Sequence, residues 1–143
     1  MPEAELAPLT ALVGDWRLQG ALPGDGAPTI RGSASFAWLD GERFLVQRWH
    51  VEPPEFPDGI AIIGADGAGG LVQHYFDARG IARRYALTVD AEGLRLERDD
   101  EDFAQRYTGR FEDSGARIAG RWERCDDGVT WEHDFDLDYV RAR

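Results

Sequence analysis

One histidine interrupts an otherwise apolar face near the end of the chain. Every second residue of the stretch 129–139 is apolar or aromatic except His133, and the residues between them are Thr130 and four acids. This alternation predicts a strand with one face toward a core and the other toward solvent. An imidazole on the core face, titrating near neutral pH, is either a hydrogen-bonded core residue or a group directed at a ligand.

A second imidazole is expected to face a phenol. If Arg79 and Gly80 form a two-residue turn, His74 lies opposite Tyr85 and both point inward. Such a pair either forms a structural hydrogen bond that lines the barrel, or it binds a ligand or transfers protons. Arg83 shares this face, and because a buried unpaired charge is costly we favour a place for it at the open rim. An internal carboxylate or an acidic ligand are the alternative partners.

Two further hairpins extend the inward row. A turn at 127–128 sets Trp122 opposite His133, and a turn at 114–115 sets Tyr107 opposite Trp122. These rings either fill the core or line a cavity. The same registers pair opposite charges on the outer face, namely Arg117 with Asp138, Arg121 with Asp134, and Arg106 with Glu123.

The stretch 30–51 is expected to supply the opposite wall. A turn at 40–41 sets Phe36 opposite Leu45. The face with more aromatic surface, which includes Trp38 and Gln47, is predicted to point inward. His50 is then outside, so the three histidines do not meet as a metal site.

The turns divide the chain into about ten short strands after a short helix within 2–12. The predicted strands are 15–22, 30–39, 42–51, 59–64, 70–77, 81–89, 93–98, 103–112, 116–125 and 129–140, with longer loops at 23–29 and 52–58. An open sheet of this length exposes two edges, which closure removes. We therefore predict an all-β fold, a single up-and-down antiparallel barrel that occupies 1–143 as one domain.

The composition of the chain argues against several classes of binding partner. The net charge of −11 repels nucleic acid and anionic membranes. The single cysteine, Cys125, and the acidic start of the chain, which lacks a signal-peptide pattern, favour a cytoplasmic protein. The acidic run 99–102 lacks the spacing of a calcium loop, and neither a phosphate-binding loop nor a metal-ligand motif occurs. No metal is expected.

Short motifs resemble those of the calycin barrels, which include lipocalins, fatty-acid-binding proteins and nitrobindins. Gly14, Asp15 and Trp16 stand at the head of the first strand, and Gly20 extends the motif. The stretches 36–45, 73–80, 120–123 and 131–136 are similar to a broad bacterial family of calycin-like domains of unknown function. The resemblance implies a barrel whose closed end is plugged by the tryptophan. Nitrobindins bind haem through a histidine on a late strand, which implies His133 here.

These observations favour a protein that binds a small, mostly hydrophobic or aromatic molecule inside the barrel. One alternative is an enzyme of the isomerase or cyclase type, with His74, Tyr85 or His133 as acid or base. A second is haem binding through His133. Whether two copies pair as a homodimer stays open. The predicted ligand-binding residues are Trp38, Gln47, His74, Tyr85, Tyr107, Trp122 and His133.

Overall fold

The computed structural model describes residues 3–24, 29–52, 56–100 and 103–142. A short 3₁₀ helix, η1 (Ala7–Leu12), precedes the first strand, and a second, η2 (Asp113–Gly115), joins two late strands. The strands are β1 (Gly14–Ala21), β2 (Thr29–Trp38), β3 (Leu45–Glu52), β4 (Gly59–Ala65), β5 (Leu71–Asp77), β6 (Ala82–Val89), β7 (Gly93–Arg98), β8 (Ala104–Glu112), β9 (Arg117–Cys125) and β10 (Glu132–Arg141). Parts of the predicted loops 23–29 and 52–58 and of the acidic run 99–102 lie outside the described residues.

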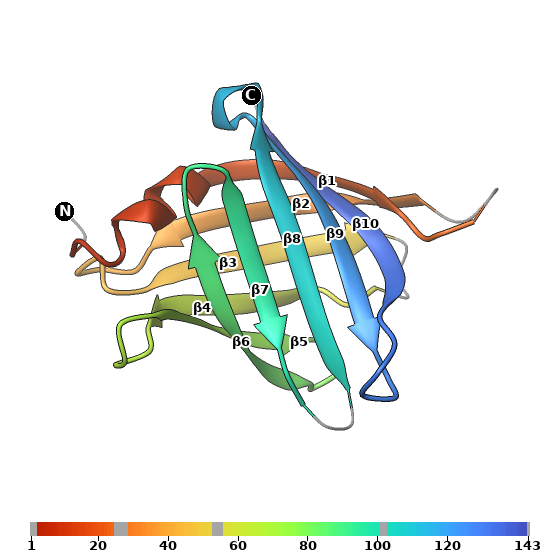
Figure 1. Cartoon of the computed structure of the whole chain (residues 1–143). Helices are drawn as coiled ribbons and strands as arrows, with labels where there is room; N and C mark the ends of the chain where they lie inside the picture. Colours follow the sequence, from red (N-terminus) through yellow and green to blue (C-terminus); the bar gives the residue numbers. More distant parts are fainter. Residues whose placement is uncertain (1–2, 25–28, 53–55, 101–102, 143) are drawn as a thin grey trace.

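The strands form one closed antiparallel barrel, as predicted. Each strand pairs with its neighbours in sequence, and β1 pairs with β10 to close the sheet. Figure 1 shows β7, β8 and β9 crossing in front of β1, β2 and β3. The core cluster holds side chains from both groups, among them Leu18, Phe36, Tyr107 and Ile118. Closure leaves no unpaired edge, which is the physical reason for expecting it.

One end of the barrel is sealed by Trp16, in agreement with the expected plug. The indole is 1% exposed and donates from Nε1 to the carbonyl of Leu12 at 2.8 Å. The guanidinium of Arg141 lies 4.2 Å from the centre of the Trp16 ring. Arg141 also donates to the carbonyls of Ala11 and Val13. Through Arg141, β10 therefore holds η1 against this end of the barrel.

The predicted side-chain orientations are correct where the observed register equals the predicted one or differs from it by an even number of residues. Tyr107 pairs with Trp122 in β8 and β9, as predicted. Phe36 pairs with Gln47 instead of Leu45, a shift of two residues caused by a four-residue loop at 40–43. A shift of two returns each side chain to the same face. Gln47 therefore points inward and His50 outward, as expected.

The β5–β6 hairpin contradicts the prediction. The backbone N–H of Asp77 bonds to the carbonyl of Ile81, which leaves a three-residue loop at 78–80 with Gly80 at φ +86°. Three-residue hairpin loops commonly end in a glycine of this conformation. The register moves by one residue, so His74 pairs with Arg84 and points outward. Gln73, which pairs with Tyr85, takes the inward position.

A bulge in β10 overturns the inward orientation of His133. His133 pairs with Glu123 and Phe135 pairs with Trp122, so Asp134 has no partner of its own in β9. An extra residue in one strand reverses the faces on either side of it. His133 consequently lies on the outer face, where its Nε2 is 2.9 Å from Oδ1 of Asp136.

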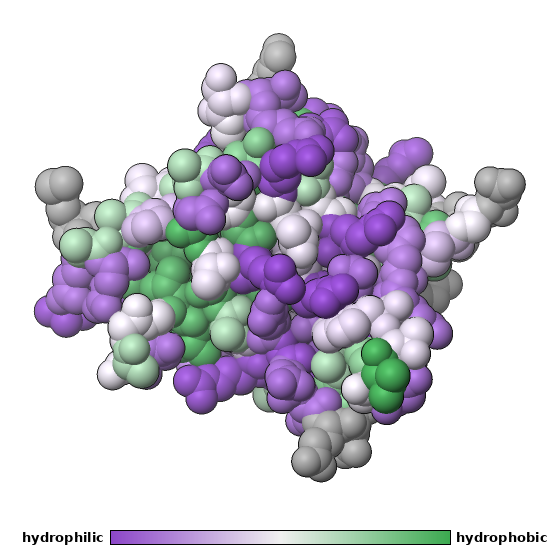
Figure 2. All heavy atoms as spheres, viewed as in Figure 1, coloured by the Kyte–Doolittle hydropathy of each residue, from purple (hydrophilic) through white to green (hydrophobic). Residues whose placement is uncertain are grey.

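The outer face is mainly charged. Figure 2 shows hydrophilic residues over most of one side, with a hydrophobic area toward the end that carries η1. Two predicted ion pairs are confirmed, Arg106 with Glu123 at 2.8 Å and Arg117 with Asp138. The third is wrong, because the bulge brings Asp136 and not Asp134 to Arg121. The two confirmed pairs are half-buried, whereas Arg121 and Asp136 are exposed, and an exposed pair contributes little to stability. Within the described ranges, no helix has the length and apolar character needed to cross a membrane.

Candidate functional site

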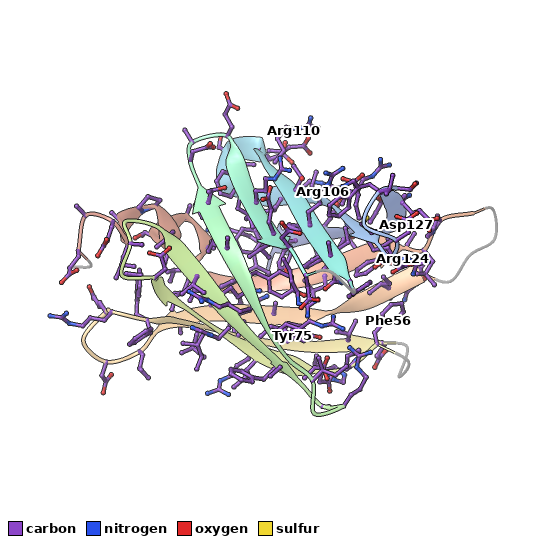
Figure 3. All side chains as sticks on the ribbon, turned by 60° about the horizontal axis from the view of Figure 1, so that its bottom comes forward. Phe56, Tyr75, Arg106, Arg110, Arg124 and Asp127 are labelled. Carbon is purple, nitrogen blue, oxygen red and sulfur yellow. The ribbon has the colours of Figure 1, made fainter. Side chains whose placement is uncertain are left out.

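The barrel encloses a cavity of about 370 Å³. Its lining includes Leu22, Phe56, Arg79 and Phe103, which lie at or beyond the strand ends away from η1. Figure 3 shows Phe56 at this end of the barrel together with Arg124 and Asp127. The cavity therefore opens at the end opposite the Trp16 plug. Its volume is in the range of pockets that hold small organic molecules.

A continuous series of aromatic rings crosses the cavity. Neighbouring ring centres are 5.4 to 6.2 Å apart, and the two ends of the series, Trp49 and Phe56, both come from the β3–β4 region. Such spacing is favourable for stacked and edge-to-face pairs. The series runs Trp49, Tyr75, Tyr85, Trp122, Phe135, Phe56. It gives a ligand large flat apolar surfaces on several sides.

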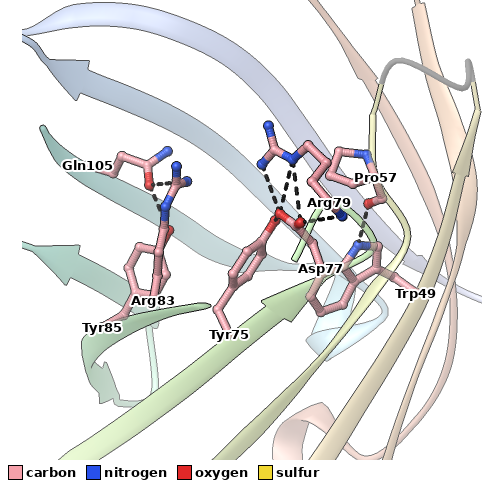
Figure 4. A network of polar contacts seen from close by, with 8 residues as sticks. All are labelled: Trp49, Pro57, Tyr75, Asp77, Arg79, Arg83, Tyr85 and Gln105. Carbon is pink, nitrogen blue, oxygen red and sulfur yellow. Dashed lines mark hydrogen bonds and ion pairs between the residues drawn. The ribbon is translucent and has the colours of Figure 1, made fainter. Parts of the chain in front are cut away.

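Three buried glutamines add polar groups to this apolar lining. Gln47, Gln73 and Gln105 are 6%, 6% and 8% exposed, and all three line the cavity. Oε1 of Gln105 accepts hydrogen bonds from Tyr85 at 2.6 Å and from Arg83 at 3.1 Å (Figure 4). Nε2 of Gln47 is 3.2 Å from the hydroxyl of Tyr139. Neutral amides both donate and accept, so these groups can orient a polar ligand atom.

The mouth is organised around a buried carboxylate, Asp77. It accepts hydrogen bonds from the Tyr75 hydroxyl at 2.6 Å and from the backbone N–H and guanidinium of Arg79 (Figure 4). Burial opposes ionisation, but the hydrogen bonds from Arg79 and Tyr75 outweigh it and lower the pKa of Asp77 to about 2. Burial and the bond to Asp77 raise the pKa of Tyr75. Both side chains are therefore held in fixed protonation states.

A second carboxylate, Asp134, reaches the cavity because of the β10 bulge. Burial raises its pKa, and the main group that counters this rise is Arg124, whose Nη1 is 3.5 Å away. The bulge that removes His133 from the interior thus places a carboxyl group at the mouth instead.

The structure divides the predicted site residues into three groups. Gln47, Tyr85 and Trp122 line the cavity. Trp38 and Tyr107 pack in the core, and the Tyr107 hydroxyl donates to the carbonyl of Leu137 at 2.8 Å. His74 and His133 are directed outward and line no part of the cavity, so the predicted orientation of both is wrong. Arg83 does line it, beside the ring of Phe103.

Sequence reasoning missed Gln73, Tyr75 and Gln105. The apolar alternation of β5 is ambiguous, because Val72 and Phe76 on one face compete with Leu71 and Tyr75 on the other. The available signal was Gly80, since a single glycine after Arg79 also fits a three-residue loop. Gln105 shares the face of Tyr107 two residues along β8, so alternation alone could have identified it.

The cavity does not fit haem. All three histidines are described, and none lines the cavity. The tyrosine hydroxyls of Tyr75 and Tyr85 are engaged with Asp77 and Gln105. No imidazole is therefore available inside the barrel for the axial position that histidine fills in haem proteins.

Hemin addition provides the first test of this geometry. We expect no Soret band of histidine-ligated haem, and we expect the His133→Ala variant to give the same absorption spectrum as the wild type. The reason is the outward position of His133, whose ring bonds to Asp136. A shifted Soret band in the wild type that disappears in His133→Ala would contradict this placement.

Comparison with known proteins supports the fold. No family model and no curated protein matches the chain. Among solved structures, the crystal structure of Rv2717c from M. tuberculosis superposes with a TM-score of 0.67. The two sequences are 15% identical, and the alignment covers 100% of both chains. At this identity the likeness shows a shared ten-stranded barrel architecture and carries no function with it.

Proposed function

We propose that this protein binds a small, mostly apolar molecule inside the barrel. The observation that carries the proposal is the cavity of about 370 Å³, lined by aromatic rings and by three buried amide side chains. A barrel that served only as a scaffold gains most stability by filling its interior, because packed side chains contribute dispersion and hydrophobic free energy. An apolar lining with a few convergent polar groups is typical of ligand sites.

The lining also indicates where affinity and selectivity arise. Burial of apolar ligand surface contributes roughly 25 cal/mol per Å². The stacked rings of Trp49 and Tyr75 offer such surface from β3 and β5, and Trp122 offers it from β9. The amides then orient the ligand, because a polar atom that fails to meet them loses its hydrogen bonds to water without replacement.

Acid–base catalysis in the same cavity has less support. Of the three residues predicted for that chemistry, His74 and His133 face outward. Burial raises the pKa of Tyr85, and its hydroxyl is already bonded to Gln105. The remaining geometry therefore favours binding.

A plugged cavity tests the proposal. Val51 lines the cavity on β3, and Val51→Trp is expected to fill part of it, whereas Arg48→Trp adds the same ring to the exposed outer face. We expect the neutral fluorescent probe N-phenyl-1-naphthylamine to bind the wild type and Arg48→Trp alike, and Val51→Trp at least tenfold more weakly.

Native mass spectrometry of gently purified protein supplies a second readout. A co-purified small molecule should appear with the wild type and with Arg48→Trp, and should be lost from Val51→Trp. If the wild type neither carries a small molecule nor binds the probe, the proposed function is wrong.

A further inference from the structure

One buried side chain in the cavity has no hydrogen-bonding partner among the residues that the structure describes. Gln73 is 6% exposed, lies on the inward face of β5 and lines the cavity. Across the described residues, no backbone or side-chain group hydrogen-bonds to its amide, whereas Gln47 and Gln105 each have one amide atom engaged. The amide of Gln73 faces the open cavity, so its hydrogen bonds come from whatever occupies the cavity, solvent or ligand.

The two neighbouring glutamines leave complementary atoms available. Gln105 uses Oε1 for Tyr85 and Arg83, so within the described chain its NH₂ group has no partner. Gln47 uses Nε2 for Tyr139, so its Oε1 is the group left to the cavity. With the whole amide of Gln73, the cavity thus presents donors and acceptors together. A ligand group that only accepts, or only donates, would leave some of these atoms unpaired.

The charges of the cavity and of the whole chain favour a neutral ligand group over an anionic one. Asp134 lines the cavity, and the chain carries a net charge of −11. Both features disfavour an anion. Arg79, which also lines the cavity, is paired with Asp77 at 2.8 Å. Arg83, the other arginine of the lining, donates to Gln105 and lies 5.2 Å from the centre of the Phe103 ring. It holds the Gln105 oxygen so that the NH₂ group remains for the ligand.

The geometry points to a ligand whose inner end carries a neutral group with both a carbonyl acceptor and an N–H donor, of the carboxamide or lactam class. Gln73 binds this group through a reciprocal pair of hydrogen bonds, and the aromatic walls hold the apolar remainder. This inference rests on the proposed function, and it adds the chemical class of ligand that the site selects.

Three isosteric probes distinguish the ligand classes. They are 2-naphthamide, 2-naphthoate and 2-isopropylnaphthalene, which share a ring system and differ in the terminal group. Binding is followed by quenching of the fluorescence of Trp49 and Trp122, both of which line the cavity. We expect 2-naphthamide to bind at least tenfold more tightly than either of the others.

A matched pair of variants assigns the preference to one residue. In Gln73→Leu, the advantage of 2-naphthamide over 2-isopropylnaphthalene should fall at least tenfold while the hydrocarbon still binds. Gln19→Leu makes the same change on the exposed face of β1 and should leave all three affinities unchanged. If Gln73→Leu does not fold, the side-chain NH₂ signals of Gln73 in the wild type provide the readout, and they should shift on addition of 2-naphthamide.

The outcomes separate the two proposals. If no probe binds the wild type, the proposed function fails and this inference fails with it. If 2-isopropylnaphthalene binds as tightly as 2-naphthamide, or 2-naphthoate binds most tightly, only the inferred ligand class is wrong. An amide preference that survives in Gln73→Leu, or unmoved Gln73 signals, overturns the role of that residue.

Discussion

The variant Gly120→Ala is expected to lose about 3 kcal/mol or more of its free energy of unfolding, the upper part of the range for overpacked cores. A Cβ atom at Gly120 would lie 1.8 Å from the Tyr107 hydroxyl oxygen and 2.1 Å from the ring carbon that bears it. Tyr107 cannot move aside easily, because it is 2% exposed and donates to the carbonyl of Leu137. Chemical denaturation followed by tryptophan fluorescence measures the loss.

A second substitution tests the cause. Removing the ring in Tyr107→Ala should make the added methyl group harmless, so Gly120→Ala should cost much less in the Tyr107→Ala background. Gly70→Ala serves as a milder comparison, because a Cβ there comes no closer than 2.8 Å to its nearest neighbour, the Asp66 carboxylate. Additive losses in the double variant would show that the clash with Tyr107 is not the reason.

The variant Asp77→Asn is expected to lose about 2 kcal/mol of stability at pH 7. That value follows from the fall of the Asp77 pKa from 3.8 to about 2, at about 1.36 kcal/mol per pKa unit. Hydrogen bonds from Arg79 and from the Tyr75 hydroxyl stabilise the negative charge of Asp77. The uncharged amide of the asparagine variant binds the guanidinium more weakly. Urea denaturation at several pH values measures the difference.

The sign of the pH dependence follows from a pKa that is lower in the folded protein. The contribution of Asp77 is complete above about pH 4 and disappears as the pH falls through about 2. The gap between wild type and Asp77→Asn should therefore close in acid. Asp126→Asn, which alters an exposed carboxylate at the same end of the barrel, should differ little from the wild type at any pH. A gap that persists at pH 2 would rule out this electrostatic explanation.

The sequence alone determined the architecture of this protein. Turn residues such as Gly41, Gly80 and Gly128 divide it into ten alternating segments, and closing them removes the sheet edges. The position of Tyr107 opposite Trp122 also followed from a local turn pattern, and the burial of Trp16 agrees with what the resemblance implied. These features depend on alternation and turn chemistry, which short stretches encode completely.

The identity of the cavity residues depended on the register of each strand pair, which alternation alone does not give. A shift of one residue in the register of a strand moves each of its side chains from the interior to solvent or the reverse, whereas a shift of two leaves the faces unchanged. The four-residue loop at 40–43 left Gln47 inside, whereas the three-residue loop at 78–80 exchanged His74 for Gln73. Each of these loops has a glycine, and the sequence does not state how many residues the turn spans.

The bulge in β10 shows the same limit more sharply. His133 follows the alternation of its strand perfectly, yet it lies outside because Asp134 is inserted between two pairs of the β9–β10 ladder. The positions of Phe135, Leu137 and Tyr139, which line the cavity, are set by β9 on one side and β1 on the other. Alternation and turn residues determined that a barrel forms. Only the length of the β5–β6 loop and the bulge in β10, which set the register in the folded barrel, decided that glutamines and not histidines face its cavity.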